Sequence, residues 1–192
     1  MQILRASDSA ATPWINGGGV TREVALSPPG TGSAAFDWRI SIATVTRNGP
    51  FSVFPGVDRE LAVLKGMLTL SIQGQDETSL GPQSPAIHFP GDVPTSGDPR
   101  GGPVTDLNVM TRRGRYSSRM TRIVIQGRHV QAERAAISFL VALAPARILR
   151  RGHEHELKPH DAVRFEAADG EVIVSAQSTA CVLVEILATP AP

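Results

Sequence analysis

The stretch from Asp106 to Arg113 constrains the fold more than any other, because it has the pattern of one strand with two unlike faces. Successive side chains of a β-strand point to opposite sides, so Asp106, Asn108 and Met110 share one face, and the other face is mainly apolar. A face that carries an acid, an amide and a thioether predicts the wall of a site.

A second stretch, Trp38 to Ala43, repeats this pattern. Arg39 and Ser41 alternate with apolar residues, as expected for a strand with one polar face. A polar face exposed to solvent would explain one such strand. Two strands with matched polar faces predict a cavity lined by both.

Composition limits the classes of partner. The chain has 192 residues, of which 41% are hydrophobic, and this suffices for one large or two small domains with a full core. Its 19 basic and 18 acidic residues give a net charge of +1, so no overall field attracts nucleic acid or an anionic membrane. We expect neither as a partner.

Cysteine usage and hydropathy indicate the cellular compartment. Cys181 lies in the apolar run Ala180 to Leu187, where a buried inert thiol is expected, and a single cysteine forms no intrachain disulfide. The N-terminal residues lack a basic segment followed by an apolar core, and no apolar run approaches the roughly 20 residues of a membrane span. These features predict a cytoplasmic protein.

Short apolar and β-branched runs, separated by 15 prolines and 18 glycines, predict an all-β fold. Strands are expected at residues 2–5, 21–26, 36–45, 58–65, 67–72, 86–89, 105–111, 120–125, 137–143, 147–150, 162–166, 171–175 and 180–187. So many segments exceed one simple sheet and predict a sandwich or barrel. Helix content should be low, with one turn near Val130 to Ala136.

The positions of proline, glycine and arginine also predict the loops and the connection between two halves of the chain. Ser27 to Ala35 and Pro94 to Pro103 are rich in proline and glycine and are expected to be mobile surface loops. The basic stretch Arg113 to Arg119 is expected to connect two β halves. We place these halves at residues 1–114 and 115–192, packed as one compact unit.

Four blocks carry a resemblance to a known family: Pro13 to Glu23, Phe36 to Ala43, Gly49 to Arg59, and Asp106 to Arg113. In this order they resemble the HutD/Ves family, which is cupin-like. The resemblance extends from the N-terminus to about Gly114, and the remainder is similar in length and β pattern. It implies a double cupin-like β-barrel, or bicupin, in a cytoplasmic bacterial protein associated with histidine utilisation, without an established enzymatic activity.

The cupin part of the resemblance has its own segments. Pro55 to Leu70 resembles the first characteristic cupin segment, and Phe89 to Asp92 resembles its later turn. Metal-binding cupins place two histidines before this strand, where the chain has Asp58 and Arg59. The resemblance therefore implies that the usual metal centre is absent, and we expect no cofactor.

Arg39 is the leading candidate for contact with a ligand. An arginine on the inner face of a barrel needs an anionic partner, and its planar fork suits a carboxylate. A buried ion pair with Asp106 or Glu23 is the alternative, and the two interpretations are compatible. Ser41 and Asn108 can hydrogen-bond the polar end of a ligand or satisfy neighbouring backbone groups.

Three further motifs could form a binding site, but each also has a purely structural explanation. Asn16 precedes three glycines, and we expect a tight turn there with Asn16 at the mouth of the cavity. His153, His155 and His160 have a spacing that can chelate zinc or nickel, but their densely charged segment favours an exposed turn. The arginines between residues 112 and 122 favour a solvated connector over a nucleic-acid site.

These observations predict a regulatory small-molecule binding protein whose N-terminal half holds a small carboxylate, for which the family resemblance suggests formylglutamate. The expected contacts are Arg39, Ser41, Asp106, Asn108, Asn16 and Glu23. One alternative is a cupin enzyme that uses either a metal on the three histidines or acid–base chemistry at Asp106 and Glu23. Another is an interaction protein that forms a homodimer through exposed strand edges.

Overall fold

The computed structural model describes residues 1–189 except 32–34, 132–134, 136, 151, 167, 168, 170 and 171. Across these residues the fold is all-β, with one short 3-10 helix, η1 (Ala6–Asp8), and no α-helix. This confirms the predicted fold class. In the same residues, no helix has the length and apolar character needed to cross a membrane.

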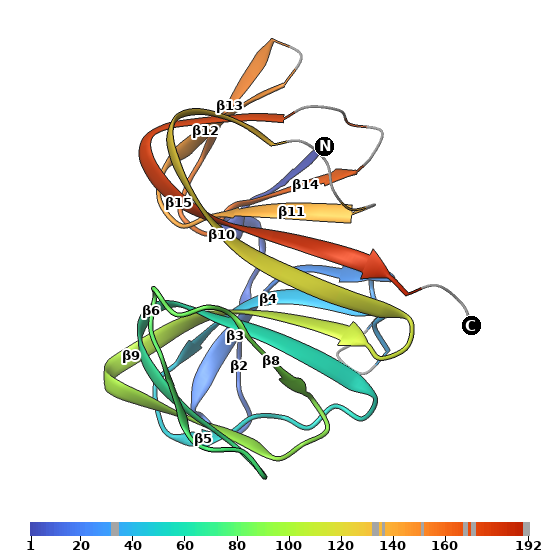
Figure 1. The fold of residues 1–192 in the computed structure, drawn as a ribbon, viewed down its shortest axis with the longest axis vertical. Helices are drawn as coiled ribbons and strands as arrows, with labels where there is room; N and C mark the ends of the chain where they lie inside the picture. Colours follow the sequence, from blue (N-terminus) through green and yellow to red (C-terminus); the bar gives the residue numbers. More distant parts are fainter. Residues whose placement is uncertain are drawn as a thin grey trace. The chain divides into compact units, whose positions relative to one another are not determined.

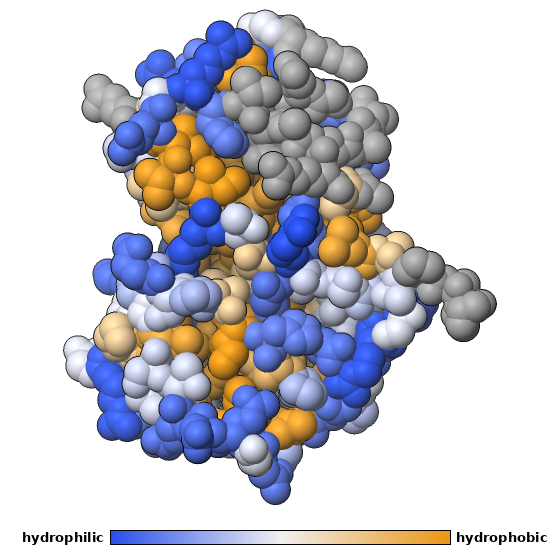
Figure 2. All heavy atoms as spheres, in the orientation of Figure 1, coloured by the Kyte–Doolittle hydropathy of each residue, from blue (hydrophilic) through white to orange (hydrophobic). Residues whose placement is uncertain are grey.

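The described residues divide into two compact units. The N-terminal unit comprises Ser9–Ser117 with Thr189, and the C-terminal unit comprises Met1–Asp8 with Ser118–Ala188. Each unit is built on one curled antiparallel sheet, and the long strands of each bend strongly along their length (Figure 1). In both units apolar side chains, drawn in orange, reach the surface between hydrophilic ones (Figure 2).

The sheet of the N-terminal unit has eight strands. Its main path runs through β2 (Ala11–Pro13), β3 (Gly19–Ser27), β4 (Trp38–Val45), β9 (Thr95–Arg112), β6 (Val57–Ile72) and β7 (Thr78–Leu80). In addition, β5 (Gly49–Pro50) pairs with β9, and β8 (Ile87–Pro90) pairs with β6. A core of aliphatic side chains and Phe89 fills one end of the curl.

Two long strands of this unit depart from the sequence prediction. Residues 58–65 and 67–72 form the single strand β6, because irregularities around Lys65 and Gly66 bend the strand without ending it. The prediction of a loop at Pro94 to Pro103 is wrong, since β9 begins at Thr95 and its residues 95–100 pair with β6. Residues 98–100 of β9 pair with β6 alone, and Pro103 has no pairing partner on either side among the described residues, so neither proline has to donate to a second strand.

The sheet of the C-terminal unit has seven strands. Its path runs through β1 (Gln2–Leu4), β14 (Ala162–Glu166), β11 (Ile137–Ala142), β15 (Val172–Ala188), β12 (Ala146–Arg150) and β13 (His153–Leu157), and β10 (Tyr116–Gln131) pairs with β15. Cys181 lies in the core of this unit, as expected, and burial raises the pKa of its thiol to about 11. The turn expected near Val130 to Ala136 falls largely outside the described residues, as does the centre of the loop from Ser27 to Ala35.

The first eight residues belong to the C-terminal unit, although the sequence analysis placed them in the N-terminal half. Strand β1 pairs with β14 and forms one end of the C-terminal sheet. The Met1 ammonium group contacts Asp169, and Arg5 Nη1 lies 2.8 Å from Asp161 Oδ2. Pairing between the first and the last third of a chain leaves no local signature in the sequence, because these contacts span more than 150 residues.

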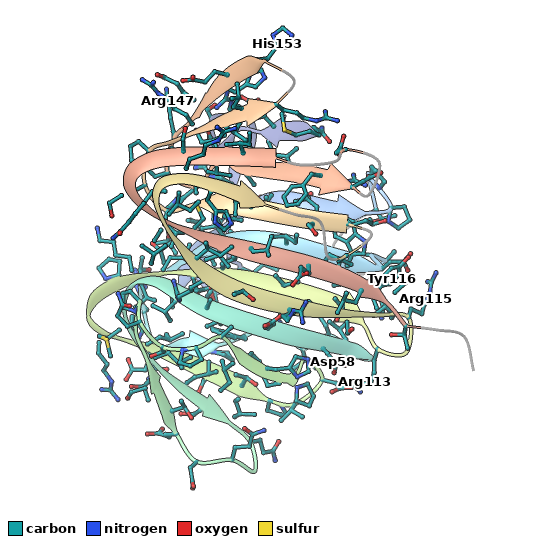
Figure 3. The ribbon with its side chains drawn as sticks, turned by 45° about the horizontal axis from the view of Figure 1, so that its top comes forward. Asp58, Arg113, Arg115, Tyr116, Arg147 and His153 are labelled. Atoms are coloured by element: carbon teal, nitrogen blue, oxygen red, sulfur yellow. The ribbon has the colours of Figure 1, made fainter. Side chains whose placement is uncertain are left out.

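The β9–β10 turn carries an arginine that links two other segments. Arg113 donates from Nε to Asp58 Oδ1 at 2.9 Å and from Nη1 to Asp92 Oδ2 at 2.9 Å, and Figure 3 shows Arg113 beside Asp58, which lies at the start of β6. The hydrogen bond from Arg113 lowers the pKa of Asp92 to about 2. This residue therefore fixes the turn to the start of β6 and to the turn after β8.

The bend in β6 gives a stability prediction. Gly66 has φ +84°, and a Cβ at this position would lie 2.9 Å from the carbonyl oxygen of Pro103, whereas Gly74 has φ +82° and nothing within 4 Å. Gly66→Ala should therefore destabilise the protein by roughly 1–2 kcal/mol more than Gly74→Ala, because both carry the backbone strain and only Gly66 adds a clash. Equal shifts in urea midpoint for the two variants would contradict this account.

Candidate functional site

Strand register brings polar side chains from three neighbouring strands onto one face of the N-terminal sheet. The β4–β9 pairing places Arg39 opposite Met110 and Ser41 opposite Asn108, while the β9–β6 pairing places Arg59 opposite Met110. Opposed residues in an antiparallel pair share a face. The two arginines therefore flank Met110, and Ser41 and Asn108 lie one step further along the strands.

This face forms one wall of a cavity of about 650 Å³. The other walls come from β2 with the turn after it, and from the segment that follows β5. The cavity is lined by Thr12, Pro13, Trp14, Ile15, Asn16, Thr21, Arg39, Ser41, Ala43, Pro50, Phe51, Ser52, Phe54, Arg59, Asp106, Asn108 and Met110. The lining includes five of the six residues predicted to contact a ligand, and Glu23 lies beside it.

Glu23 is the partner of Arg39. Arg39 Nε lies 3.2 Å from Glu23 Oε2, with 16% of the arginine side chain and 42% of the glutamate side chain exposed. Register places Glu23 opposite Ser41, and an irregularity after Glu23 shifts the rest of β3 relative to β4. Of the two ion pairs considered for Arg39, the structure forms the one with Glu23, and Asp106 is not its partner.

Arg59 is the most deeply buried cation of the cavity, with 5% of its surface exposed. Its guanidinium carbon lies 5.2 Å from the centre of the Phe54 ring and 5.7 Å from that of Phe51, and Nη2 donates to the carbonyl oxygen of Ser52. Its Nε is buried without a hydrogen-bond partner among the described residues. Burial lowers the pKa of Arg59 to about 10, against the opposing effect of Asp106, so the side chain stays cationic at neutral pH.

Asp106 and Asn108 form a polar pair on β9. Asn108 Nδ2 donates to Asp106 Oδ1 at 3.0 Å. The second oxygen of Asp106, Oδ2, and the side-chain oxygen of Asn108 are buried without a partner among the described residues. Burial raises the pKa of Asp106 to about 7, although the hydrogen bond from Asn108 and the charge of Arg59 both lower it. Desolvation outweighs these effects because only 1% of Asp106 is exposed.

The glycine-rich segment shapes the mouth of the cavity as a turn, as preferred from the sequence. Gly17 has φ +66°, and the backbone N–H of Gly18 donates to Asn16 Oδ1 at 2.9 Å. A Cβ on Gly19 would lie 2.3 Å from the carbonyl oxygen of Thr44, so only glycine allows β3 to approach β4 here. Trp14 Nε1 donates to Thr21 Oγ1 at 2.7 Å and fixes the indole in the wall.

Sequence reasoning missed Arg59 as a cavity residue and treated it only as a replacement for a cupin histidine. The alternation of Arg59, Leu61 and Val63 would have indicated that all three share the inner face of β6. It also gave no role to Phe51 and Phe54. Their signal was weak, because they lie in a proline-rich segment between strands, where no periodicity shows which way a side chain points.

The histidine motif lies in the C-terminal unit, and none of its three histidines lines the cavity of the N-terminal unit. His153 and His155 alternate on β13, and His153 stands at the end of the β12–β13 hairpin (Figure 3). His160 lies in the turn before β14, with φ +71°. Among the residues that the structure describes, no group of three or more histidine, cysteine or carboxylate side chains is placed to hold a metal ion.

Comparisons with known proteins identify the family of this chain. The sequence profile of the HutD family matches residues 6–183. The chain belongs to the HutD family. An uncharacterised 21.2 kDa protein encoded in the hutC 3′ region of Pseudomonas putida is 31% identical over 189 residues, covering 97% of both chains. Protein Ves of Cronobacter sakazakii is 40% identical over 117 residues, which covers 60% of this chain and 62% of that protein.

Solved structures of HutD-like proteins have the same fold. A conserved protein of unknown function from Pseudomonas aeruginosa superposes with a TM-score of 0.87 at 30% identity, covering 97% of this chain and 98% of that one. HutD from Pseudomonas fluorescens superposes with a TM-score of 0.81 at 29% identity, covering 98% and 99%. A cupin barrel protein from Leptotrichia buccalis, at 10% identity and TM-score 0.62 over 96% of both chains, shows that the HutD fold is cupin-like.

The buried carboxyl of Asp106 predicts how stability depends on pH. The unfolded chain releases this proton near pH 3.8 and the folded chain near pH 7, so the folded protein should lose stability as pH rises from 4 to 7 and change little above that. Asp106→Asn has no buried carboxyl to ionise, so it should raise the free energy of unfolding above pH 7 by up to about 4 kcal/mol relative to the unchanged protein. Near pH 4 the substitution should have little effect. Urea unfolding at both pH values measures the difference.

The matched control for this measurement is the exposed residue Asp76, since Asp76→Asn removes a carboxylate in the same unit without relieving a buried charge. A pH-independent effect of Asp106→Asn, or an equal effect of Asp76→Asn, would show that burial of Asp106 does not set this dependence.

Proposed function

We propose that this HutD-family protein binds a small carboxylate in the N-terminal cavity and serves a regulatory role in histidine utilisation in the cytoplasm. The observation that carries the proposal is the excess of positive charge in a confined, partly apolar space. Arg39 and Arg59 both line the cavity. Arg39 has one glutamate partner, Glu23, and the acid whose charge acts on Arg59 is Asp106. Because the pKa of Asp106 is about 7, the two arginines are not fully neutralised at neutral pH.

The size and composition of the cavity support a metabolite as its occupant. A volume of about 650 Å³ lies within the range of small-molecule sites, which combine apolar walls with a few placed polar groups. Trp14, Phe51 and Phe54 supply the apolar walls, and Ser41 and Asn108 supply uncharged polar groups beside the arginines. The name of the Pseudomonas putida relative, which refers to a hutC region, supports a link to histidine utilisation.

The two arginines support different roles in such binding. The guanidinium of Arg59 lies over the rings of Phe51 and Phe54 and donates to a backbone carbonyl, so it supplies a fixed positive charge. Arg39 is more exposed and is held by one contact with Glu23, so its guanidinium retains donors for a ligand carboxylate. We therefore propose Arg39 as the main contact and Arg59 as the fixed source of positive potential.

Calorimetry at pH 7 with formylglutamate, glutamate, urocanate and histidine tests this proposal. At least one of these carboxylates should bind, and Arg39→Ala should weaken that binding at least about tenfold, because a charge-assisted contact is lost. Arg47→Ala is the control, since Arg47 is exposed in the same unit and does not line the cavity. Failure of a folded sample to bind any of the four, or unchanged binding in Arg39→Ala, would contradict the proposal.

Asp106 supports a second candidate function, an acid–base enzyme acting on a small metabolite. A buried carboxyl with a pKa of about 7 is suited to exchange a proton at neutral pH, which the two arginines cannot do. Incubating the protein with the same four compounds and following them by proton NMR separates binding from turnover. Conversion that disappears in Asp106→Asn would establish the enzyme, and unchanged spectra with measurable binding would favour the binding protein.

A further inference from the structure

The β12–β13 hairpin of the C-terminal unit carries two histidines on one face of an edge strand. His153 and His155 are two residues apart on β13, so their side chains project from the same side of the strand. His153 is exposed and His155 is half-buried, and among the described residues neither imidazole has a hydrogen-bond or ion-pair partner. Arg150, opposite His153 on β12, is already paired with Asp169, with 2.6 Å between Nη2 and Oδ1. Two unpaired imidazoles beside each other are a candidate pair of ligands for a transition metal.

One chain does not complete such a site. Zinc in a structural site takes four nitrogen or sulfur ligands in a tetrahedral arrangement. Within the described part of the chain, no third histidine, cysteine or carboxylate is placed to share a metal ion with His153 and His155. Glu154 and Glu156 alternate with the histidines and project from the opposite side of β13. A second molecule therefore has to supply the remaining ligands.

Strand β13 has an edge on which a second copy of the chain can pair. It is the last strand of the C-terminal sheet, and β12 is its one pairing partner among the described strands. The N–H and C=O groups along its other edge can pair with another strand. Two identical antiparallel strands related by a two-fold axis pair reciprocally, so that if residue i lies opposite residue j, residue j lies opposite residue i. When Glu154 lies on the axis, His153 of each copy lies opposite His155 of the other.

This register brings four imidazoles onto one face. Residues two apart on a strand are separated by about 7 Å, and opposed residues of an antiparallel pair by about 5 Å, so the four Cα atoms form a small rectangle. Imidazoles that rise from its corners can converge on one ion above its centre, at zinc–nitrogen distances of about 2.0–2.1 Å. A register with His155 on the axis would instead place His153 opposite Leu157 and separate the two copies of His153. Only the register centred on Glu154 pairs all four histidines.

We infer that two copies of this protein pair edge to edge through β13 and share one zinc ion, bound by His153 and His155 of each copy. The site is incomplete in a single chain, and the second copy contributes half of its ligands. This inference does not depend on the proposed function, because neither histidine lines the N-terminal cavity. It makes zinc a ligand that controls assembly, and no reaction is assigned to the metal.

The charges of the hairpin make this pairing depend on the metal. On the side of β13 opposite the histidines, Arg147 Nη1 lies 3.2 Å from Glu154 Oε1, and Arg147 Nη2 lies 3.9 Å from Glu156 Oε1. One guanidinium thus faces two carboxylates, and Figure 3 shows Arg147 and His153 on the same hairpin. Pairing brings the Glu154 side chains of both copies opposite each other, which is destabilising by itself. A divalent cation held by the four histidines offsets this excess of negative charge.

Sedimentation of the full chain, without a histidine tag and freed of metal by a chelator, tests the shared site. Addition of zinc should double the sedimenting mass and saturate at one bound zinc ion per two chains, as measured by elemental analysis. Magnesium, which prefers oxygen ligands, should leave the mass unchanged. His153→Gln and His155→Gln each remove two of the four ligands from the dimer, so each should raise the zinc concentration needed for doubling at least about tenfold.

The matched control is His88→Gln. His88 is an exposed histidine of the N-terminal unit, so this variant should assemble with zinc like the unchanged protein. A mass that zinc does not change, doubling that persists at the same zinc concentration in both hairpin variants, or an equal loss of doubling in His88→Gln would overturn the inference.

Disulfide formation tests the register. Glu154→Cys places two thiols opposite each other on the axis, within the Cα separation of about 4.4–6.8 Å that a disulfide spans, and on the side away from the metal. Under mild oxidation this variant should form a covalent dimer much faster with zinc than without it. Glu156→Cys is the control, because in this register residue 156 lies opposite Gly152 of the other copy. The native Cys181 is fully buried and does not compete.

The outcome for Glu154→Cys decides between edge-to-edge pairing and any other zinc-linked arrangement. Cross-linking of Glu156→Cys as fast as that of Glu154→Cys, or cross-linking of Glu154→Cys that does not depend on zinc, would overturn the pairing of the two β13 strands. So would a mass that zinc doubles through the two histidines while Glu154→Cys fails to cross-link.

Discussion

The site depends on the register of β9 between β4 and β6. In this register Met110 of β9 lies between Arg39 of β4 and Arg59 of β6. The same register turns Asn108 and Asp106 toward the cavity. A slip of one residue would turn the apolar Leu107 and Val109 into the cavity and remove every polar group of β9 from it. Both of these residues are completely buried, so the register is held by packing on the face opposite the cavity. The chemistry of one face is therefore positioned by the apolar character of the other.

The same arrangement explains why the charges of the cavity are unequally paired. Arg59 is held by aromatic rings and a carbonyl oxygen, and these contacts position a cation without neutralising it. Asp106 is near enough to influence the pKa of Arg59, yet desolvation still raises its own pKa to about 7. A direct salt bridge between them would have lowered that pKa further. The cavity therefore holds both a cation and a titratable acid, and each keeps one buried atom without a hydrogen-bond partner among the described residues.

The parts of this site that the sequence could predict are those that follow from strand alternation. The matched polar faces of 39–43 and 106–110 depend on local periodicity, and both runs do form neighbouring strands of one sheet. Glu23 as the partner of Arg39 was one of two alternatives, and the choice depended on an irregularity in β3 that no residue type specifies. Arg59 was overlooked because its strand was compared with a metal-binding motif instead of being analysed by its own alternation. The strand at residues 2–5 was expected, but its partner could not be predicted, because the residues of β14 lie about 160 positions away in the sequence.

The two long strands show why proline and glycine mislead in a sheet of this kind. Pro99 and Pro103 suggested a loop, but β9 continues through both because one of its edges has no partner strand there. Gly66 suggested a break in β6, but its positive φ allows the strand to bend while pairing resumes at Met67. A curled sheet needs such bends in the strands that cross it, and straight strands would leave the cavity open. The residues that weaken a strand prediction are thus found where the long strands of this sheet bend.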